Sequence, residues 1–140
     1  MEAPRAIQPD ELEEIFPVVA EIVADALARN LAEVRLDSRL IDDLGAESID
    51  FLDVVFRLEQ AFKVEIPRGQ ILEDARGELS EQEFEQNGRL TDAGVARLKP
   101  VLSEVPQGRF HPGMKVGDIP ALFTVETFCK LVARARRASG

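Results

Sequence analysis

One serine in this sequence lies where its side chain could be covalently modified. Ser48 follows an Asp-Asp-Leu-Gly run at residues 42–45 and closely precedes an amphipathic stretch, so we expect it at the N-terminus of a helix. The first N–H groups of a helix lack partners within the helix, and the helix dipole is positive at that end. A phosphate esterified to the Ser48 hydroxyl would therefore be favoured at this position.

Helix capping and nucleophilic catalysis are two other roles for Ser48. Serine is among the best N-cap residues, but Phe51 stands where a capping box would have its reciprocal Glu or Gln. A nucleophilic serine needs a neighbouring base, and neither His nor Lys lies near Ser48 in the sequence. Modification by another enzyme therefore fits Ser48 better than catalysis by a hydrolase, while simple capping stays open.

Acidic residues crowd the region around Ser48. The cluster contains no basic residue and consists of Asp42, Asp43, Glu47, Asp50 and Asp53. Negative charge near a helix N-terminus gains about 0.3 to 1 kcal/mol, so a solvated acidic face explains the cluster. A docking surface for a basic partner explains it equally well, and the sequence leaves both interpretations open.

Three amphipathic helices are expected to position this region. Apolar residues recur at helical spacing over about 17–30, 48–62 and 124–137. We place Pro17 at the first position of the first helix, after a short turn, because proline inside a helix costs about 3 kcal/mol. Residues 31–47 are expected to form a long connection that lies against the core.

The segment from about 68 to 117 differs in character because it is rich in glycine and proline. We expect a short helix over 80–86, which starts with a Ser-x-x-Glu capping box, and another over about 91–102. Residues 106–120 are then predicted to form a loop. Our hypothesis is that this insertion packs beside the helical core and restricts which enzymes can dock.

Composition favours one all-α domain. The chain has 140 residues, of which 45% are hydrophobic, and it contains neither Trp nor Tyr. Its apolar residues are mainly Ala, Val, Leu, Ile and Phe with few β-branched runs, which favours helices packed on helices. The size and apolar content suffice for a single hydrophobic core.

Charge indicates the kind of partner. The formal net charge is −9, and residues 1–87 hold 22 acidic and 8 basic residues whereas residues 88–140 have a net charge of +5. Nucleic acid is an unsuitable partner for such a chain, because binding to it depends on clustered Lys and Arg. A basic partner protein would be attracted to residues 1–87, which carry most of the negative charge.

Cysteine and histidine usage excludes two kinds of structural site. Cys129 is the only cysteine and His111 the only histidine, so neither an intramolecular disulfide nor a Cys/His zinc site can form, and we predict no metal. Cys129 is expected to be a buried, inert thiol, and His111 receives no role. With no apolar run near the ~20 residues needed to span a bilayer, we expect a cytoplasmic, soluble monomer.

The segment from Leu40 to Pro67 resembles the central part of acyl carrier proteins. It reads LIDDLGAESIDFLDVVFRLEQAFKVEIP. The resemblance implies that Ser48 receives 4′-phosphopantetheine from coenzyme A and that the thiol of this arm holds acyl groups as thioesters. The usual Asp-Ser-Leu motif is altered here, with Glu47 in place of Asp and Ile49 in place of Leu.

The resemblance also assigns two surfaces on the helix that follows Ser48. The residues expected to bind partner enzymes are Glu47, Asp50, Asp53 and Glu59. The residues expected to line an acyl pocket are Ile49, Leu52, Phe56 and Phe62. Without the resemblance, the simplest interpretation of these four residues is that they belong to the hydrophobic core. The implied partners are a phosphopantetheinyl transferase and acyl-loading and acyl-transfer or synthase enzymes with basic docking patches.

The predicted fold is therefore an acyl-carrier-like helical bundle with an additional helical and loop insertion. Residues 1–140 are expected to form one carrier domain, with carrier-like segments at about 10–67 and 118–137 and the insertion at about 68–117. The expected function is non-catalytic delivery of acyl intermediates in lipid or related biosynthesis. An aminoacyl or peptidyl carrier and an unmodified acidic interaction module are the alternatives.

Overall fold

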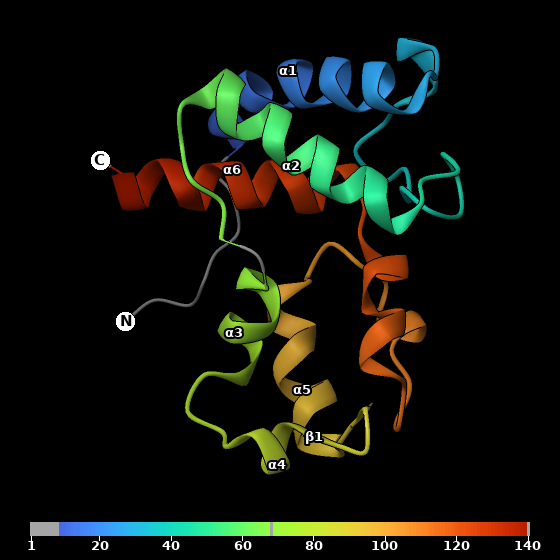
Figure 1. The fold of residues 1–140 in the computed structure, drawn as a ribbon, viewed down its shortest axis with the longest axis vertical. Helices are drawn as coiled ribbons and strands as arrows, with labels where there is room; N and C mark the ends of the chain where they lie inside the picture. Colours follow the sequence, from blue (N-terminus) through green and yellow to red (C-terminus); the bar gives the residue numbers. More distant parts are fainter. Residues whose placement is uncertain (1–8, 68, 140) are drawn as a thin grey trace.

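The computed structural model describes residues 9–67 and 69–139, which are mostly helical (Figure 1). The elements in chain order, with η for 3-10 helices, are α1 (Pro9–Leu27), η1 (Leu31–Glu33), α2 (Ser48–Phe62), α3 (Gln70–Arg76), α4 (Glu81–Phe84), β1 (Glu85–Gln86), β2 (Arg89–Leu90), α5 (Asp92–Val101), η2 (Gln107–Arg109), η3 (Val116–Leu122) and α6 (Val125–Ser139). The all-α prediction is confirmed, with one small antiparallel hairpin formed by β1 and β2. None of the helices described is long and apolar enough to cross a membrane.

Helices α1, α2 and α6 form a three-helix bundle, seen in the upper half of Figure 1. Its core includes Val23 of α1, Leu58 of α2 and Val132 of α6, which are fully buried. Helix α6 runs antiparallel to α1, because ion pairs near its C-terminus reach the first turns of α1. The predicted helices over 48–62 and 124–137 are confirmed.

Helix α1 is longer than we predicted. It begins at Pro9 and continues through Pro17, which we had expected to be its first residue. Proline in a helix interior costs about 3 kcal/mol. Ile15 and Val19, on either side of Pro17, are both fully buried in the core, and burial contributes about 1.5 to 3 kcal/mol for each such side chain. Tertiary packing thus outweighs the local penalty.

The insertion has an apolar core of its own, formed by α3, α5 and the segments that follow them. Phe84, Leu98, Leu102 and Ile119 are among its buried residues. In Figure 1 this lobe lies below the bundle.

Local signals in the insertion were partly recognised in the sequence. The Ser80 and Glu83 capping box is present, with hydrogen bonds of 2.8 and 3.1 Å, and α5 forms as expected. Helix α4 ends at Phe84 and not at residue 86, because the chain turns into the hairpin through Asn87 and Gly88, both with positive φ. Helix α3 was not predicted, and the expected loop over 106–120 contains the 3-10 helices η2 and η3.

Among the residues that the structure describes, three ion pairs join the insertion to the rest of the chain. Lys130 of α6 pairs with Glu104 at 2.6 Å, and Arg134 of α6 forms an ion pair with Asp74 of α3. Arg109 of η2 pairs with Asp42, in the loop before α2, at 3.3 Å. The insertion therefore packs beside the bundle, as we expected, while its effect on docking stays a prediction.

Candidate functional site

The N-terminus of α2 places Ser48 as the first helical residue. The N-cap is Glu47, whose backbone is extended with φ −109° and ψ 168°. The Asp50 carboxylate accepts a 2.8 Å hydrogen bond from the Glu47 N–H, as the reciprocal residue of a capping box does. Ser48 is therefore not the N-cap, although its side chain lies outside the part of the chain that the structure describes.

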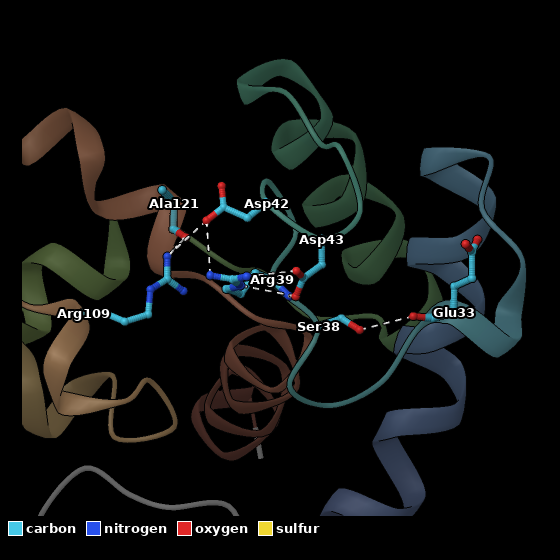
Figure 2. Close-up of polar contacts among 7 residues, drawn as sticks. All are labelled: Glu33, Ser38, Arg39, Asp42, Asp43, Arg109 and Ala121. Atoms are coloured by element: carbon cyan, nitrogen blue, oxygen red, sulfur yellow. Dashed lines mark hydrogen bonds and ion pairs between the residues drawn. The ribbon is translucent and has the colours of Figure 1, made fainter.

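The loop before α2 is held by a network around Arg39, shown in Figure 2. The Asp43 carboxylate accepts hydrogen bonds from the Arg39 backbone N–H at 2.8 Å and from its guanidinium at 3.1 and 3.3 Å. These bonds lower the pKa of Asp43 below its ordinary value. Ser38 donates to the Glu33 carbonyl at 3.3 Å, which fixes the preceding turn.

This loop also pairs with the chain just before α6. The Leu40 N–H donates to the Phe123 carbonyl at 3.2 Å, and the Val125 N–H donates to the Ser38 carbonyl at 3.0 Å. The loop then turns at Gly45, whose φ of +75° favours glycine. Pairing and turn together fix where α2 begins.

The insertion reaches this loop through Arg109. Its Nη2 atom donates to the Asp42 carboxylate at 3.3 Å and to the Ala121 carbonyl at 3.1 Å, as Figure 2 shows. Arg39 approaches the same Asp42 carboxylate at 3.6 Å. Sequence reasoning missed the Arg109 contact because the partners are 67 residues apart.

Local contacts engage three of the four residues predicted to bind partners. Asp50 holds the Glu47 N–H, as described above. Asp53 pairs with Arg57 at 3.0 Å, and the Glu59 carboxylate accepts a 2.7 Å hydrogen bond from the Ile66 N–H. Glu59 thus holds the backbone that follows α2 in place through this hydrogen bond. Glu47 is exposed.

An apolar stripe is exposed on α2. Ile49, Leu52 and Phe56 are 70%, 47% and 59% exposed, and their spacing places them along one side of the helix. The simpler interpretation of these three residues as core is therefore wrong, while their predicted role in an acyl pocket stays a prediction. The bundle core takes Val54 and Leu58 from α2, and half-buried Phe62 packs against it.

A cavity of about 310 Å³ lies between the bundle and the insertion, and we call it the seam cavity. Its walls in the described residues are entirely apolar, glycine or proline. One wall contains the rings of Phe51, Phe123 and Phe128, whose centroids are 5.9 to 6.2 Å apart. Among the four predicted acyl-pocket residues, Leu52 lines this cavity, and the lining does not include the other three.

Cys129 and His111 take the positions that the sequence suggested. Cys129 is fully buried in α6, and burial raises the pKa of its thiol to about 12. A thiol with so high a pKa is unreactive near neutral pH, which supports the prediction that Cys129 is inert. His111 is exposed in the segment between η2 and η3.

Comparisons with known proteins identify the family. Residues 17–76 match the profile of a family described as "Phosphopantetheine attachment site". Over 63 residues the chain is 41% identical to an acyl carrier protein of Clostridium perfringens, which covers 45% of this chain and 78% of that protein. Over 70 residues it is 36% identical to the acyl carrier protein AcpXL of Rhizobium meliloti, covering 49% of this chain and 74% of that protein.

A further relative agrees with this assignment. An acyl carrier protein of Clostridium acetobutylicum is 40% identical over 53 residues, which cover 38% of this chain and 69% of that protein. The comparison with solved structures returned no significant match. The sequence identity and the phosphopantetheine profile show that this chain belongs to the acyl carrier protein family, whose prosthetic group is 4′-phosphopantetheine.

Proposed function

We propose that this protein carries acyl groups as thioesters on a 4′-phosphopantetheine arm attached to Ser48. It delivers them to partner enzymes of lipid or related biosynthesis in the cytoplasm and catalyses no step itself. The observation that carries this proposal is the position of Ser48 as the first residue of α2, within the segment that matches the phosphopantetheine profile. The unpaired N–H groups and the dipole of that helix end favour the phosphate of the arm.

Attachment of the arm is a phosphoryl transfer performed by another enzyme. The Ser48 hydroxyl oxygen attacks the coenzyme A phosphorus atom nearer the pantetheine, and the bond from that phosphorus to the bridging oxygen breaks. Adenosine 3′,5′-bisphosphate leaves, and the hydroxyl proton passes to a base of the transferase. Once attached, the arm would supply a terminal thiol that can hold an acyl group as a thioester.

The face of α2 that partners contact combines charge with apolar surface. Ile49 and Phe56 are exposed, and Glu47, Asp50 and Asp53 lie on the same helix or at its cap. Arg57 holds Asp53 and also pairs with Asp25 of α1 at 2.6 Å, so a basic patch on a partner must compete with it. Long-range attraction to the acidic half would still raise the rate of encounter and weaken as salt increases.

Intact mass spectrometry tests the attachment. The chain is coexpressed with a phosphopantetheinyl transferase, and we expect one added phosphopantetheine, which Ser48→Ala abolishes. Ser38→Ala is the matched control, since Ser38 is buried in the loop before α2 and should not accept the arm. A folded protein that remains unmodified under these conditions would instead be the unmodified acidic interaction module.

An acyl carrier differs from an aminoacyl or peptidyl carrier in the polarity of the group that it carries. Burying an amine or amide without a partner costs about 1 to 3 kcal/mol or more, whereas an alkyl chain gains from burial. The apolar lining of the seam cavity therefore favours the acyl carrier.

A further inference from the structure

Arg109 extends from the insertion to the loop that leads to Ser48. It is the last residue of η2, and the next residue, Phe110, is buried in the core of the insertion. The Arg109 backbone N–H donates to the Pro106 carbonyl at 3.0 Å. Packing and backbone bonding therefore fix where the Arg109 side chain starts, so its place depends on the fold of the insertion.

The guanidinium of Arg109 bridges two segments of the chain. Its Nη2 atom donates to the Ala121 carbonyl of η3 at 3.1 Å and to the Asp42 carboxylate at 3.3 Å, as Figure 2 shows. The Arg109 side chain is only 22% exposed, and salt screens a partly buried pair less than a fully exposed one. Hydrogen bonds between charged groups are also stronger than those between neutral groups. This contact can therefore hold Asp42 in place.

Asp42 lies in a compact turn that leads to the start of α2. The Gly45 N–H donates to the Ile41 carbonyl at 3.1 Å. The Ala46 N–H donates to the Leu40 carbonyl at 2.8 Å, so both hydrogen bonds enclose Asp42. Helix α2 begins two residues after the second donor. A side chain that holds Asp42 therefore restricts how the chain enters α2.

We propose that Arg109 is a positioning residue for attachment of the arm. By holding Asp42, it keeps the turn before α2 in the conformation that the transferase binds. This inference rests on the proposed function. It couples the insertion to Ser48, because a change in the packing of η2 would move the Arg109 side chain and release the turn.

Charge alone predicts the opposite effect of Arg109. Asp42 belongs to the acidic region around Ser48, and removing a positive charge beside it makes this region more negative. A basic patch on the transferase would then be attracted more strongly, and its KM for the chain would fall. Loss of positioning instead raises KM and leaves kcat unchanged, because the turn must be ordered when the transferase binds. The direction of the change in KM therefore separates the two effects.

Loading kinetics of Arg109→Gln test the proposal. The concentration of the full-length chain is varied against a fixed amount of transferase with saturating coenzyme A, and intact mass gives the initial rates. We expect KM to rise about fivefold with kcat unchanged, which corresponds to about 1 kcal/mol, the upper end for an exposed ion pair. Arg136→Gln is the matched control and should keep the original KM, because Arg136 Nη2 also contacts a carboxylate at 3.3 Å, that of Glu14 in α1.

A double-mutant cycle tests whether Arg109 acts through Asp42. Asp42 is exposed, so Asp42→Ala should fold, and circular dichroism confirms that each variant is folded. Once Asp42 is replaced, adding Arg109→Gln should raise KM by less than about twofold. A further fivefold rise in the double variant would show that Arg109 does not act through Asp42 and would overturn the proposal.

Hydrogen exchange measures the turn without the arm or the transferase. We expect the Gly45 and Ala46 amides to exchange about fivefold faster in Arg109→Gln, because their hydrogen bonds close the turn. Asp42→Ala should show the same increase and serves as the second variant if Arg109→Gln does not fold, whereas Arg136→Gln should show none.

Two kinds of failure can be told apart. Unchanged exchange at both amides, or a KM for Arg109→Gln that is unchanged or lower, would overturn the coupling between the insertion and the turn. An arm that never attaches to the unchanged protein would instead overturn the proposed function, and the exchange rates would still show whether Arg109 holds the turn.

Discussion

The ion pair between Lys130 and Glu104 gives the sharpest stability prediction. The two groups are 2.6 Å apart, and their side chains are only 11% and 2% exposed. Replacing one partner of a buried pair typically costs about 3 to 5 kcal/mol, because the other charge is left buried and uncompensated. Lys130 also donates to the Val101 carbonyl and to Ser103 Oγ, both at 3.1 Å, and keeps these bonds in Glu104→Gln. We therefore expect the lower limit, a loss of about 3 kcal/mol.

Urea unfolding followed by circular dichroism measures this loss, and a thermal scan should show a Tm lower by about 10 °C. Glu14→Gln is the control, because Glu14 pairs with Arg136 at 3.3 Å with its side chain 65% exposed. Such a surface pair contributes about 0 to 1 kcal/mol. A Glu104→Gln cost as small as that of the control would refute the argument that burial makes this pair important.

Two further predictions concern α2 and α5. Phe56→Ser should change the free energy of unfolding by less than about 0.5 kcal/mol, since Phe56 is exposed. The same variant should nevertheless be loaded more slowly by the transferase. The control is Leu31→Ser, which also alters an exposed residue and should leave the loading rate unchanged. Equal loading rates for both variants would exclude Phe56 from docking. Gly94→Ala should lower the urea midpoint although alanine favours helices by about 1 kcal/mol, because the new Cβ would lie 2.2 Å from the Phe84 carbonyl oxygen. A raised midpoint would show that α5 does not pack this closely.

The sequence predicted the long helices well because their signals are local. Helices α2 and α6 combine apolar residues at helical spacing with clear end signals. The predicted start of α1 was wrong because we applied the local rule that proline disfavours a helix interior. The burial of Ile15 and Val19 contributes more free energy than Pro17 costs. The Asn-Gly pair at 87–88 was a usable hairpin signal that we overlooked, while the seven-residue α3 offers too short a pattern to recognise.

The candidate site could be located from the sequence, but its surroundings could not. The position of Ser48 follows from a contiguous motif and the start of one helix. Periodicity then indicates that Ile49, Leu52 and Phe56 share a side of α2, but it does not indicate whether another element covers that side. The contact between Arg109 and Asp42 depends on how distant segments pack.

Helix α6 has a consequence for synthesis of the protein on the ribosome. Its residues Phe128 and Val132 complete the bundle core, Leu131 packs against both cores, and Lys130 and Arg134 hold the insertion. This helix follows the other described elements, so a nascent polypeptide that has not yet exposed it cannot complete the bundle core, whereas the buried residues of the insertion core all precede it. Helices α1 and α2 must therefore wait with apolar surface uncovered until α6 has been made, although they are synthesised first.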